Sequence, residues 1–397
     1  MRSGNAIFAS GGTAVFEVMS ALARECGAIN LGQGFPDEPG PAEVIDAAAR
    51  ALTEQSNQYP SMMGIPELRQ AVAAHDRRFY GLEVDWRAEV LVTSGATEAL
   101  AAAILGLINP GDEVVLIEPL YDSYLPIVRL AGAIPRLVRL EPPDWRLPRS
   151  ALAAVCCQRT KLLVLNTPMN PTGKVFQSEE LTYLAGLLAR HDAVAVCDEV
   201  YEHLVFEGAR HQPLMALPGM RERCVRIGSA GKTFSMTGWK VGYITAAPGL
   251  LSSIAKAHQF LVFTTPPNLQ HAVAAGLGLD AGYFDGLAGR MQAKRDRLAQ
   301  GLARVGFDVR PSAGTYFLNA GFARLGGDAD DAAFCRRITA EAGVAAIPVS
   351  AFYAERGPRD HVRFCFCKQD QVLDAAVDRL ERYFRSGARL TASAGGD

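Results

Sequence analysis

The chain has 397 residues, 49% hydrophobic and 21% charged, and this length allows two domains around a large buried core. The formal net charge of −2 gives no electrostatic basis for binding nucleic acid or a membrane surface. No uninterrupted apolar stretch reaches the roughly 18 residues that a membrane helix requires.

Eight cysteines occur at irregular positions, without the Cys-x-x-Cys spacing or Cys/His clustering of a zinc site. This usage is typical of a reducing compartment. The first residues also lack the basic and apolar segments of a signal peptide. We therefore expect a cytoplasmic protein without a metal site.

Short apolar runs alternate with helical, Ala- and Leu-rich patterns between about residues 89 and 246. This alternation predicts an α/β domain with a mainly parallel sheet, flanked on both faces by helices. The predicted strands are Glu89–Thr93, Glu113–Ile117, Lys161–Leu165, Ala193–Cys197, Val225–Ile227 and Val241–Thr245, and two of the predicted helices are Glu98–Leu107 and Ser178–Arg190.

Beyond Gly278 the pattern changes to that of a smaller α+β domain. Helical periodicity extends over Tyr283–Arg304 and again near Asp330–Ala342. Strands are predicted at Thr315–Asn319 and His361–Phe366, on either side of the second helix. The small and polar residues after Ser386 are expected to be frayed.

Lys232 is a candidate nucleophile. The hydroxyls of Ser229 and Thr233 lie beside it in sequence, and Lys240 follows eight residues later. These groups suit a phosphate monoester held beside an imine. Gly-Lys-Thr at this point also resembles the end of a nucleotide phosphate loop, but Arg226 stands where that motif requires glycine.

A second phosphate-binding candidate is Ser94-Gly95-Ala96-Thr97, which follows one predicted strand and opens a helix. Backbone N–H groups at the start of a helix favour a dianionic phosphate. Taken alone, the same residues are equally compatible with a simple helix cap.

Asp198 closes an apolar run, so its carboxylate is expected at the carboxyl end of a strand, where α/β sheets bind ligands. A carboxylate there would keep a pyridine nitrogen protonated. Glu199 is the alternative, although adjacent strand side chains point to opposite faces. Tyr201 either donates to a ring oxygen or packs beneath the strand end.

Arg363 lies inside the apolar run His361–Phe366, where an unpaired guanidinium is unfavourable. A site that accepts a carboxylate resolves this conflict. An amine, a carboxylate, a phenol, phosphate-binding donors and a guanidinium are together what pyridoxal 5′-phosphate chemistry requires.

Several motifs resemble those of the fold-type I, class I and II aminotransferases, which depend on pyridoxal 5′-phosphate. They are Asn166–Gly173, Asp198–Tyr201, Ser229–Thr233 and Gly238–Gly242. Four further segments are similar to one branch, which contains kynurenine/glutamine transaminases, methionine aminotransferases and actinobacterial N-succinyldiaminopimelate aminotransferase-like proteins. These segments are Ile29–Asp37, Asn57–Pro60, Glu118–Tyr124 and Gly314–Leu318.

The resemblance implies a homodimer whose active sites are shared across the interface. It implies a large cofactor domain at residues 40–285 and a small domain formed by residues 1–39 and 286–397. The expected reaction moves the α-amino group of an amino acid to a 2-oxo acid, 2-oxoglutarate or pyruvate, by a ping-pong mechanism. A cysteine-S-conjugate β-lyase on the same scaffold is the alternative. A cofactor-sensing regulator with a DNA-binding module is disfavoured, because the pattern begins near residue 10.

The resemblance also implies roles in binding the cofactor. Lys232 would form the Schiff base and carry the proton, and Asp198 would pair with the pyridinium nitrogen. Asn170 and Tyr201 would hydrogen-bond the ring oxygen, and Tyr121 would stack on the ring. The residues implied for the phosphate are Gly95, Ala96, Thr97, Ser229 and Lys240, with Tyr59 of the partner subunit.

For the substrate, the resemblance implies that Arg363 grips the α-carboxylate with two hydrogen bonds, helped by Asn170 and the backbone of Gly34. Val15 aligns with a tryptophan of the kynurenine/glutamine transaminases and would take its place in the pocket. This substitution weakens a kynurenine assignment and leaves room for a longer or more polar side chain. The sequence does not identify the amino donor.

Overall fold

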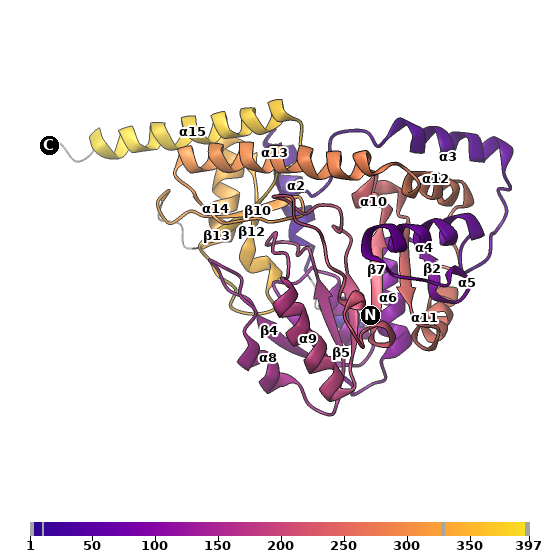
Figure 1. Ribbon diagram of the computed structural model, residues 1–397. Coiled ribbons are helices and arrows are strands. Elements are labelled where there is room, and N and C mark those ends of the chain that lie inside the picture. Colours follow the sequence, from indigo (N-terminus) through magenta and orange to yellow (C-terminus); the bar gives the residue numbers. More distant parts are fainter. Residues whose placement is uncertain (1–3, 10–11, 327–329, 394–397) are drawn as a thin grey trace.

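A seven-stranded sheet forms the centre of the computed structural model, which describes residues 4–9, 12–326 and 330–393 (Figure 1). Only β8 runs antiparallel to its neighbours, so the sheet is mainly parallel, as predicted. Its strands, in spatial order, are β2 (Val90–Thr93), β8 (Gly242–Ala246), β7 (Cys224–Ser229), β6 (Val194–Asp198), β5 (Thr160–Asn166), β3 (Glu113–Glu118) and β4 (Ile134–Arg139).

Both faces of this sheet are buried under helices. Val114 and Leu116 of β3 pack in the apolar cluster that contains α6 and α11, whereas Val115 and Ile117 pack on the opposite face with α9. This alternation follows from the two-residue period of a strand. The helices of this part are α3 (Ala42–Glu54), α4 (Pro66–Tyr80), α5 (Trp86–Glu89), α6 (Gly95–Leu107), α7 (Tyr124–Leu130), α8 (Arg149–Val155), α9 (Ser178–His191), α10 (Ala230–Thr233), α11 (Pro248–Leu261) and α12 (Pro267–Leu277).

A smaller, antiparallel sheet lies to the left of the larger one in Figure 1. Its strands, in spatial order, are β12 (Ile347–Pro348), β13 (His361–Cys365), β10 (Phe317–Gly321) and β9 (Asp308–Val309). Helix α13 (Ala281–Val305) crosses the top of this view and packs along α15 (Asp370–Ser393). Helix α14 (Asp331–Arg337) continues into a π-helical turn, Ile338–Ala342.

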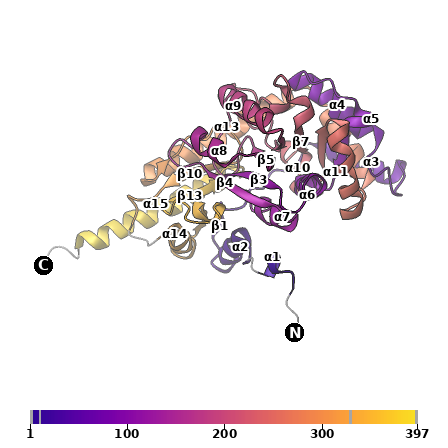
Figure 2. The ribbon, with the colours of Figure 1, turned by 90° about the horizontal axis from the view of Figure 1, so that it is seen from below.

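The N-terminal segment joins this smaller part. Strand β1 (Ile29–Asn30) pairs in parallel with β11 (Val344–Ala345), and Lys368 forms an ion pair with Asp37 at 2.9 Å. Helix α2 (Val15–Glu25) precedes β1, and α1 (Ala6–Ala9) lies beyond α2 at the outer edge of the molecule (Figure 2).

The structure differs from the sequence-based expectations at several places; for example, the short strands β1, β9, β11 and β12 were not predicted, and Glu89, expected in a strand, ends helix α5. Strand β4 was not predicted, because it is a largely half-buried edge strand that contains Pro135. Strand β10 begins two residues later than predicted, because Thr315 has a φ of 73°. Helix α15 remains helical to Ser393, so the frayed segment expected from Ser386 does not begin there; residues 394–397 lie outside the described part.

Within the described ranges, no helix combines the length and apolarity needed to cross a membrane. The parallel strands all end at one edge of the large sheet, where Glu118, Asn166, Asp198 and Ser229 are the last residues of their strands. In α/β sheets this edge is where ligands bind.

Candidate active site

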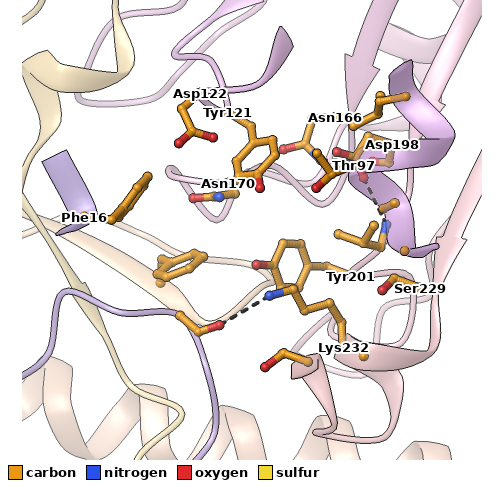
Figure 3. Close-up of a pocket in the computed structure, with 18 of the residues that line it drawn as sticks. Phe16, Thr97, Tyr121, Asp122, Asn166, Asn170, Asp198, Tyr201, Ser229 and Lys232 are labelled. Atoms are coloured by element: carbon orange, nitrogen blue, oxygen red, sulfur yellow. Dashed lines mark hydrogen bonds between the residues drawn. The ribbon is translucent and has the colours of Figure 1, made fainter. Parts of the chain in front are cut away.

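One pocket at this edge brings together almost all of the candidate residues (Figure 3). Its walls come from the carboxyl ends of β5, β6 and β7, the start of α6, helix α10 and strand β13 of the smaller sheet. The sequence-predicted residues that line it are Gly34, Gly95, Ala96, Thr97, Tyr121, Asn170, Asp198, Tyr201, Ser229, Lys232, Lys240 and Arg363.

One end of the pocket is built to hold an anion. Helix α6 begins at Gly95, so its free N–H groups and the positive end of its dipole face the pocket beside Ser229. Gly95 has a φ of 77°, and a Cβ there would lie 3.3 Å from Cε of Lys240. The start of α6 also packs closely on Gly242 of β8. A Cβ on Gly242 would lie only 2.7 Å from the carbonyl carbon of Gly95, so this contact requires a glycine.

Asp198 presents a buried carboxylate to the pocket from the end of β6, with 5% of its surface exposed. The hydroxyl of Tyr124 donates a hydrogen bond to Oδ2, and Asn166 Nδ2 donates to the backbone carbonyl at 2.9 Å. Burial raises the pKa of Asp198 to about 6, because the Tyr124 hydrogen bond and the charge of Lys232 offset only part of the desolvation. A cationic N–H from a ligand would stabilise its charged form.

Glu199 points away from this pocket. Its Oε2 accepts from Arg226 Nε at 2.6 Å and lies 2.9 Å from Nε2 of His211. Arg226 also contacts Asp76 and Glu202, and all four side chains are buried. We call Asp76, Glu199, Glu202 and Arg226 the Arg226 cluster. The period-two argument that favoured Asp198 over Glu199 therefore agrees with the geometry.

The Arg226 cluster adjoins a group of potential metal ligands, formed by His75, Glu202 and His203, whose ligand atoms lie within 4.8 Å of one another. The sequence had not indicated this group. In the structure the two Nε2 atoms form a hydrogen bond with each other at 2.7 Å, and Glu202 is held by Arg226 and Tyr80. These contacts occupy Nε2 of both histidines and the Glu202 carboxylate within the protein, so the group carries no metal assignment.

Lys232 extends from α10 toward the centre of the pocket. Its Nζ donates to the carbonyl of Gly34 at 3.3 Å and lies 5.6 Å from the ring centre of Tyr201 (Figure 3). Burial lowers the pKa of the amine, with a smaller opposing effect from Cys367, Cys365 and Asp198. A lowered pKa increases the neutral fraction, which is the nucleophilic form of an amine.

Two tyrosines, Tyr201 and Tyr121, line the pocket, and Tyr201 lies beside this amine. Burial raises the pKa of Tyr201 well above its ordinary value, so its hydroxyl keeps its proton at neutral pH. Tyr121 is partly buried, and burial raises its pKa as well. Tyr316 fixes the local backbone, since its hydroxyl donates to the carbonyl of Lys232 at 2.8 Å.

Arg363 comes from β13 of the smaller sheet and lines the pocket, with 1% of its surface exposed. It donates to Oδ1 of Asn170 at 2.9 Å and to the carbonyl of Gly32. Because the guanidinium takes the oxygen of Asn170, the amide N–H₂ is left available to a ligand. Among the residues that the structure describes, Arg363 Nε has no hydrogen-bond partner, and burial lowers the pKa of the guanidinium to about 10.

Two of the predicted site residues do not line this pocket. Phe16 lies in its wall, whereas Val15 packs against the apolar core one residue earlier on α2. Tyr59 is 83% exposed on the outer surface, with its ring edge-on to Phe263 at 5.6 Å. A role for Tyr59 therefore requires a second chain.

Sequence reasoning missed three side chains that shape the pocket. Tyr124 holds Asp198, Phe317 stacks within 3.9 Å of the Arg363 guanidinium, and Asp122 adds a carboxylate to the wall. Asp122 and Tyr124 belong to the motif Glu118–Tyr124, so this motif was the available signal.

The sequence and the structure of this chain are both similar to those of known aminotransferases. Residues 27–380 match the family model of aminotransferase class I and II. The solved N-succinyldiaminopimelate aminotransferase of Mycobacterium tuberculosis superposes with a TM-score of 0.93 at 45% identity, covering 96% of this chain and 100% of that one. The methionine aminotransferase of Escherichia coli is 41% identical over 371 residues, 94% of this chain and 96% of the relative. A kynurenine–oxoglutarate transaminase of Dictyostelium discoideum is 38% identical over 407 residues, 93% and 94% of the two chains.

Proposed function

Because the chain belongs to the class I and II aminotransferases and is a transaminase that moves amino groups to 2-oxo acids, we propose that its pocket binds pyridoxal 5′-phosphate on Lys232. The observation that carries this proposal is the convergence of three largely buried charged groups, Lys232, Asp198 and Arg363. Among the described residues, none of the three has an ion-pair partner. Buried charges without partners are unfavourable unless a ligand completes them.

The residues present fit this cofactor. The N-terminus of α6, Ser229 and Lys240 suit its phosphate, and Asp198, with its raised pKa, suits a protonated ring nitrogen. Tyr201 and the amide of Asn170 suit the ring oxygen. When bound, pyridoxal 5′-phosphate supplies an electron sink for the charge left on the substrate's Cα.

Side chains of the protein orient the substrate and transfer its proton. Arg363 and Asn170 orient the substrate by its α-carboxylate, which would also complete the unpartnered Nε. Lys232 Nζ takes the proton from Cα and returns it, and its lowered pKa suits a base near neutral pH. Asp198 holds a proton on the ring nitrogen. A second 2-oxo acid, such as 2-oxoglutarate or pyruvate, completes the ping-pong cycle.

The direct test is a transfer assay on the purified protein with added cofactor. Methionine, glutamine, kynurenine, a cysteine conjugate and N-succinyldiaminopimelate serve as donors, with 2-oxoglutarate or pyruvate as acceptors, and the new oxo acid is measured. Transfer that requires Lys232 supports the proposal, and absence of transfer from every donor contradicts it. The β-lyase alternative is not favoured by the relatives; release of pyruvate and ammonia from the cysteine conjugate without an acceptor would revive it.

We also propose a homodimer that shares its active sites. An apolar surface formed by Tyr59 and Phe260–Phe263 supports this, since Phe260 is 86% exposed and Tyr59, 83% exposed, lies outside the active-site pocket of its own chain. Tyr59 would then reach the phosphate of the partner subunit. Light scattering on the purified protein tests the dimer, and Phe260→Asp should dissociate it.

The division into residues 40–285 and the remainder, and a cytoplasmic location, are part of the same proposal. Pairing of β1 with β11 supports grouping the N-terminal segment with the C-terminal part, and α13 spans the boundary at residue 285. All eight cysteines are free, which suits a reducing compartment.

A further inference from the structure

Lys232 stands on α10, a helix of four residues and therefore little more than one turn. Helices this short are not stable on their own, so the place of α10 depends on contacts from outside it. The carbonyls of Lys232 and Thr233 also lie in the last turn, where the helix supplies them with no backbone N–H partner. Both carbonyls accept hydrogen bonds from side chains of other elements.

Two tyrosine hydroxyls supply these hydrogen bonds. Tyr316 comes just before β10 of the smaller sheet and donates to the carbonyl of Lys232 at 2.8 Å. Tyr283, near the start of α13, donates to the carbonyl of Thr233, also at 2.8 Å. Burial raises the pKa of both phenols, that of Tyr283 to about 12, so both remain donors at neutral pH. We call these two hydrogen bonds the α10 clamp.

The side chain of Lys232 is itself only weakly restrained. Its one hydrogen bond to a described residue runs from Nζ to the carbonyl of Gly34 at a long 3.3 Å. Nζ also lies 5.6 Å from the ring centre of Tyr201 (Figure 3) and 5.7 Å from that of Tyr316. A flexible four-carbon stem joins this amine to the backbone. A shift of α10 would therefore move the amine away from the substrate's Cα, whose proton it must reach within hydrogen-bond distance.

Tyr316 also connects α10 to the α-carboxylate site. Its neighbour Phe317 stacks on the Arg363 guanidinium, with 3.9 Å between the guanidinium carbon and the ring centre. Strands β10 and β13, which carry these two residues, pair with each other, and the N–H of Phe366 donates to the carbonyl of Tyr316 at 2.9 Å. The backbone around Tyr316 thus links Lys232 with Arg363 through direct contacts.

We propose that Tyr316 and Tyr283 are positioning residues for proton transfer, whose hydroxyls hold α10 so that the amine of Lys232 stays beside the substrate's Cα. This inference rests on the proposed function. Loss of a hydroxyl then slows the removal of the Cα proton but leaves the binding of substrate and cofactor intact, because neither tyrosine lines the pocket. Tyr316 has the larger effect, since its partner is the carbonyl of Lys232 itself.

Tyr316→Phe removes one hydroxyl and retains the ring. On the holoenzyme, with the fastest donor of the panel, we expect kcat to fall about tenfold and KM to stay within about twofold. The isotope effect on kcat, measured with the donor deuterated at Cα, should be at least as large as in the natural protein, because proton transfer limits the variant. Tyr283→Phe should lower kcat by about threefold. Tyr183→Phe is the matched control, since its hydroxyl donates to the carbonyl of Arg149 at 2.7 Å outside the pocket, and it should change neither quantity.

Hydrogen exchange of the cofactor-free protein tests the α10 clamp without turnover. The backbone N–H groups of residues 230–234 should exchange at least about threefold faster in Tyr316→Phe and in Tyr283→Phe. Their exchange should be unchanged in Tyr183→Phe. Unchanged exchange in all three variants would show that the hydroxyls do not hold α10, and it would contradict the inference.

The kinetic outcomes separate the two proposals. An unchanged kcat in Tyr316→Phe overturns the positioning role but leaves the transaminase proposal intact. A rise in KM at constant kcat also overturns that role, because it would assign Tyr316 to substrate binding. If Tyr316→Phe does not fold, Tyr283→Phe decides by the same criteria. Failure of transfer from every donor in the natural protein overturns both proposals.

Discussion

Asp198 and Glu199 are adjacent in the chain, but their carboxylates lie in opposite environments. Glu199 belongs to the Arg226 cluster, where one guanidinium contacts three buried carboxylates. Asp198 faces the pocket, where its strongest contact is the neutral hydroxyl of Tyr124. The comparison indicates that buried charges paired within the protein support the fold, while buried charges left unpaired mark a ligand site.

The pKa values of the two regions express this difference. Burial alone would raise the pKa of Glu202, but Arg226, the two histidines His75 and His203 and the Tyr80 hydrogen bond together more than offset burial and hold that pKa well below its usual range. Burial dominates for Asp198, whose pKa rises to about 6. The cluster therefore stabilises its charges in the folded chain, whereas the pocket does so only when its ligands are bound.

The largest expected effect comes from breaking the paired region. Arg226→Met would leave three buried carboxylates without their guanidinium, and we expect the free energy of unfolding to fall by about 3–5 kcal/mol. Urea denaturation of the cofactor-free protein measures this loss. Arg24→Met, which removes an exposed ion pair with Glu17, is the control and should change stability little. An equally small loss in both variants would contradict the structural role of the cluster.

Asp198→Asn should reduce catalysis rather than stability, the reverse of what we expect for Arg226→Met. Turnover should fall about a hundredfold, because the ring nitrogen of the cofactor loses the carboxylate that keeps it protonated. Glu199→Gln is the matched control, and it should reduce stability while retaining most of the turnover. The reverse pattern, with Glu199 required for turnover and Asp198 dispensable, would exchange the roles of the two residues.

The raised pKa of Asp198 also predicts how the stability of the cofactor-free protein depends on pH, and Asp198→Asn tests it. Folding raises the pKa of Asp198 from about 3.8 to about 6, so its stabilising contribution is complete below pH 3.8 and lost as the pH rises through 6. At pH 8, Asp198→Asn should therefore be more stable than the natural protein, by up to about 3 kcal/mol. This difference should vanish near pH 4. A constant difference across this range would show that Asp198 is not buried with a raised pKa.

Arg363→Lys is expected to lower kcat/KM for every α-amino acid by about tenfold or more, since lysine cannot form the two-pronged contact with the α-carboxylate. Stability and cofactor binding should change little, because Arg363 has no ion pair in the described structure. Amines without a carboxylate provide the control, and any reaction with them should be unaffected. Unchanged kinetics with amino acids would remove Arg363 from the substrate site.

The smallest effect is expected for Tyr124→Phe. The loss of one hydrogen bond to a charged group costs about 1.5–3 kcal/mol at most, and the cofactor would restore part of it by pairing with Asp198. Cofactor affinity, measured by titration of the cofactor-free protein, should weaken between about threefold and tenfold. Affinity equal to that of the natural protein would mean that Tyr124 does not support the Asp198 carboxylate.

The sequence predicted the parts of this arrangement that depend on local pattern. Alternating strands and helices indicated the parallel sheet, and the last residue of an apolar run indicated where Asp198 would emerge. Contacts between distant segments were not predictable in the same way. Tyr124 and Asp198 are 74 residues apart, and Arg226 meets Asp76 across 150 residues. The resemblance placed Val15 in the pocket, whereas Phe16 lies in its wall. Which of these two neighbours faces the pocket depends on the rotation of α2 about its axis, and a short sequence match does not define that rotation.

The central claim is that the unpaired charges of the pocket surround a cofactor attached to Lys232. Borohydride reduction of the holoenzyme, followed by peptide mapping, tests it most directly, because reduction makes the attachment permanent. We expect the cofactor on the peptide that contains Lys232, and no labelled peptide in Lys232→Ala even though that protein folds and binds the cofactor. A label on Lys240, or on no lysine, would contradict the account.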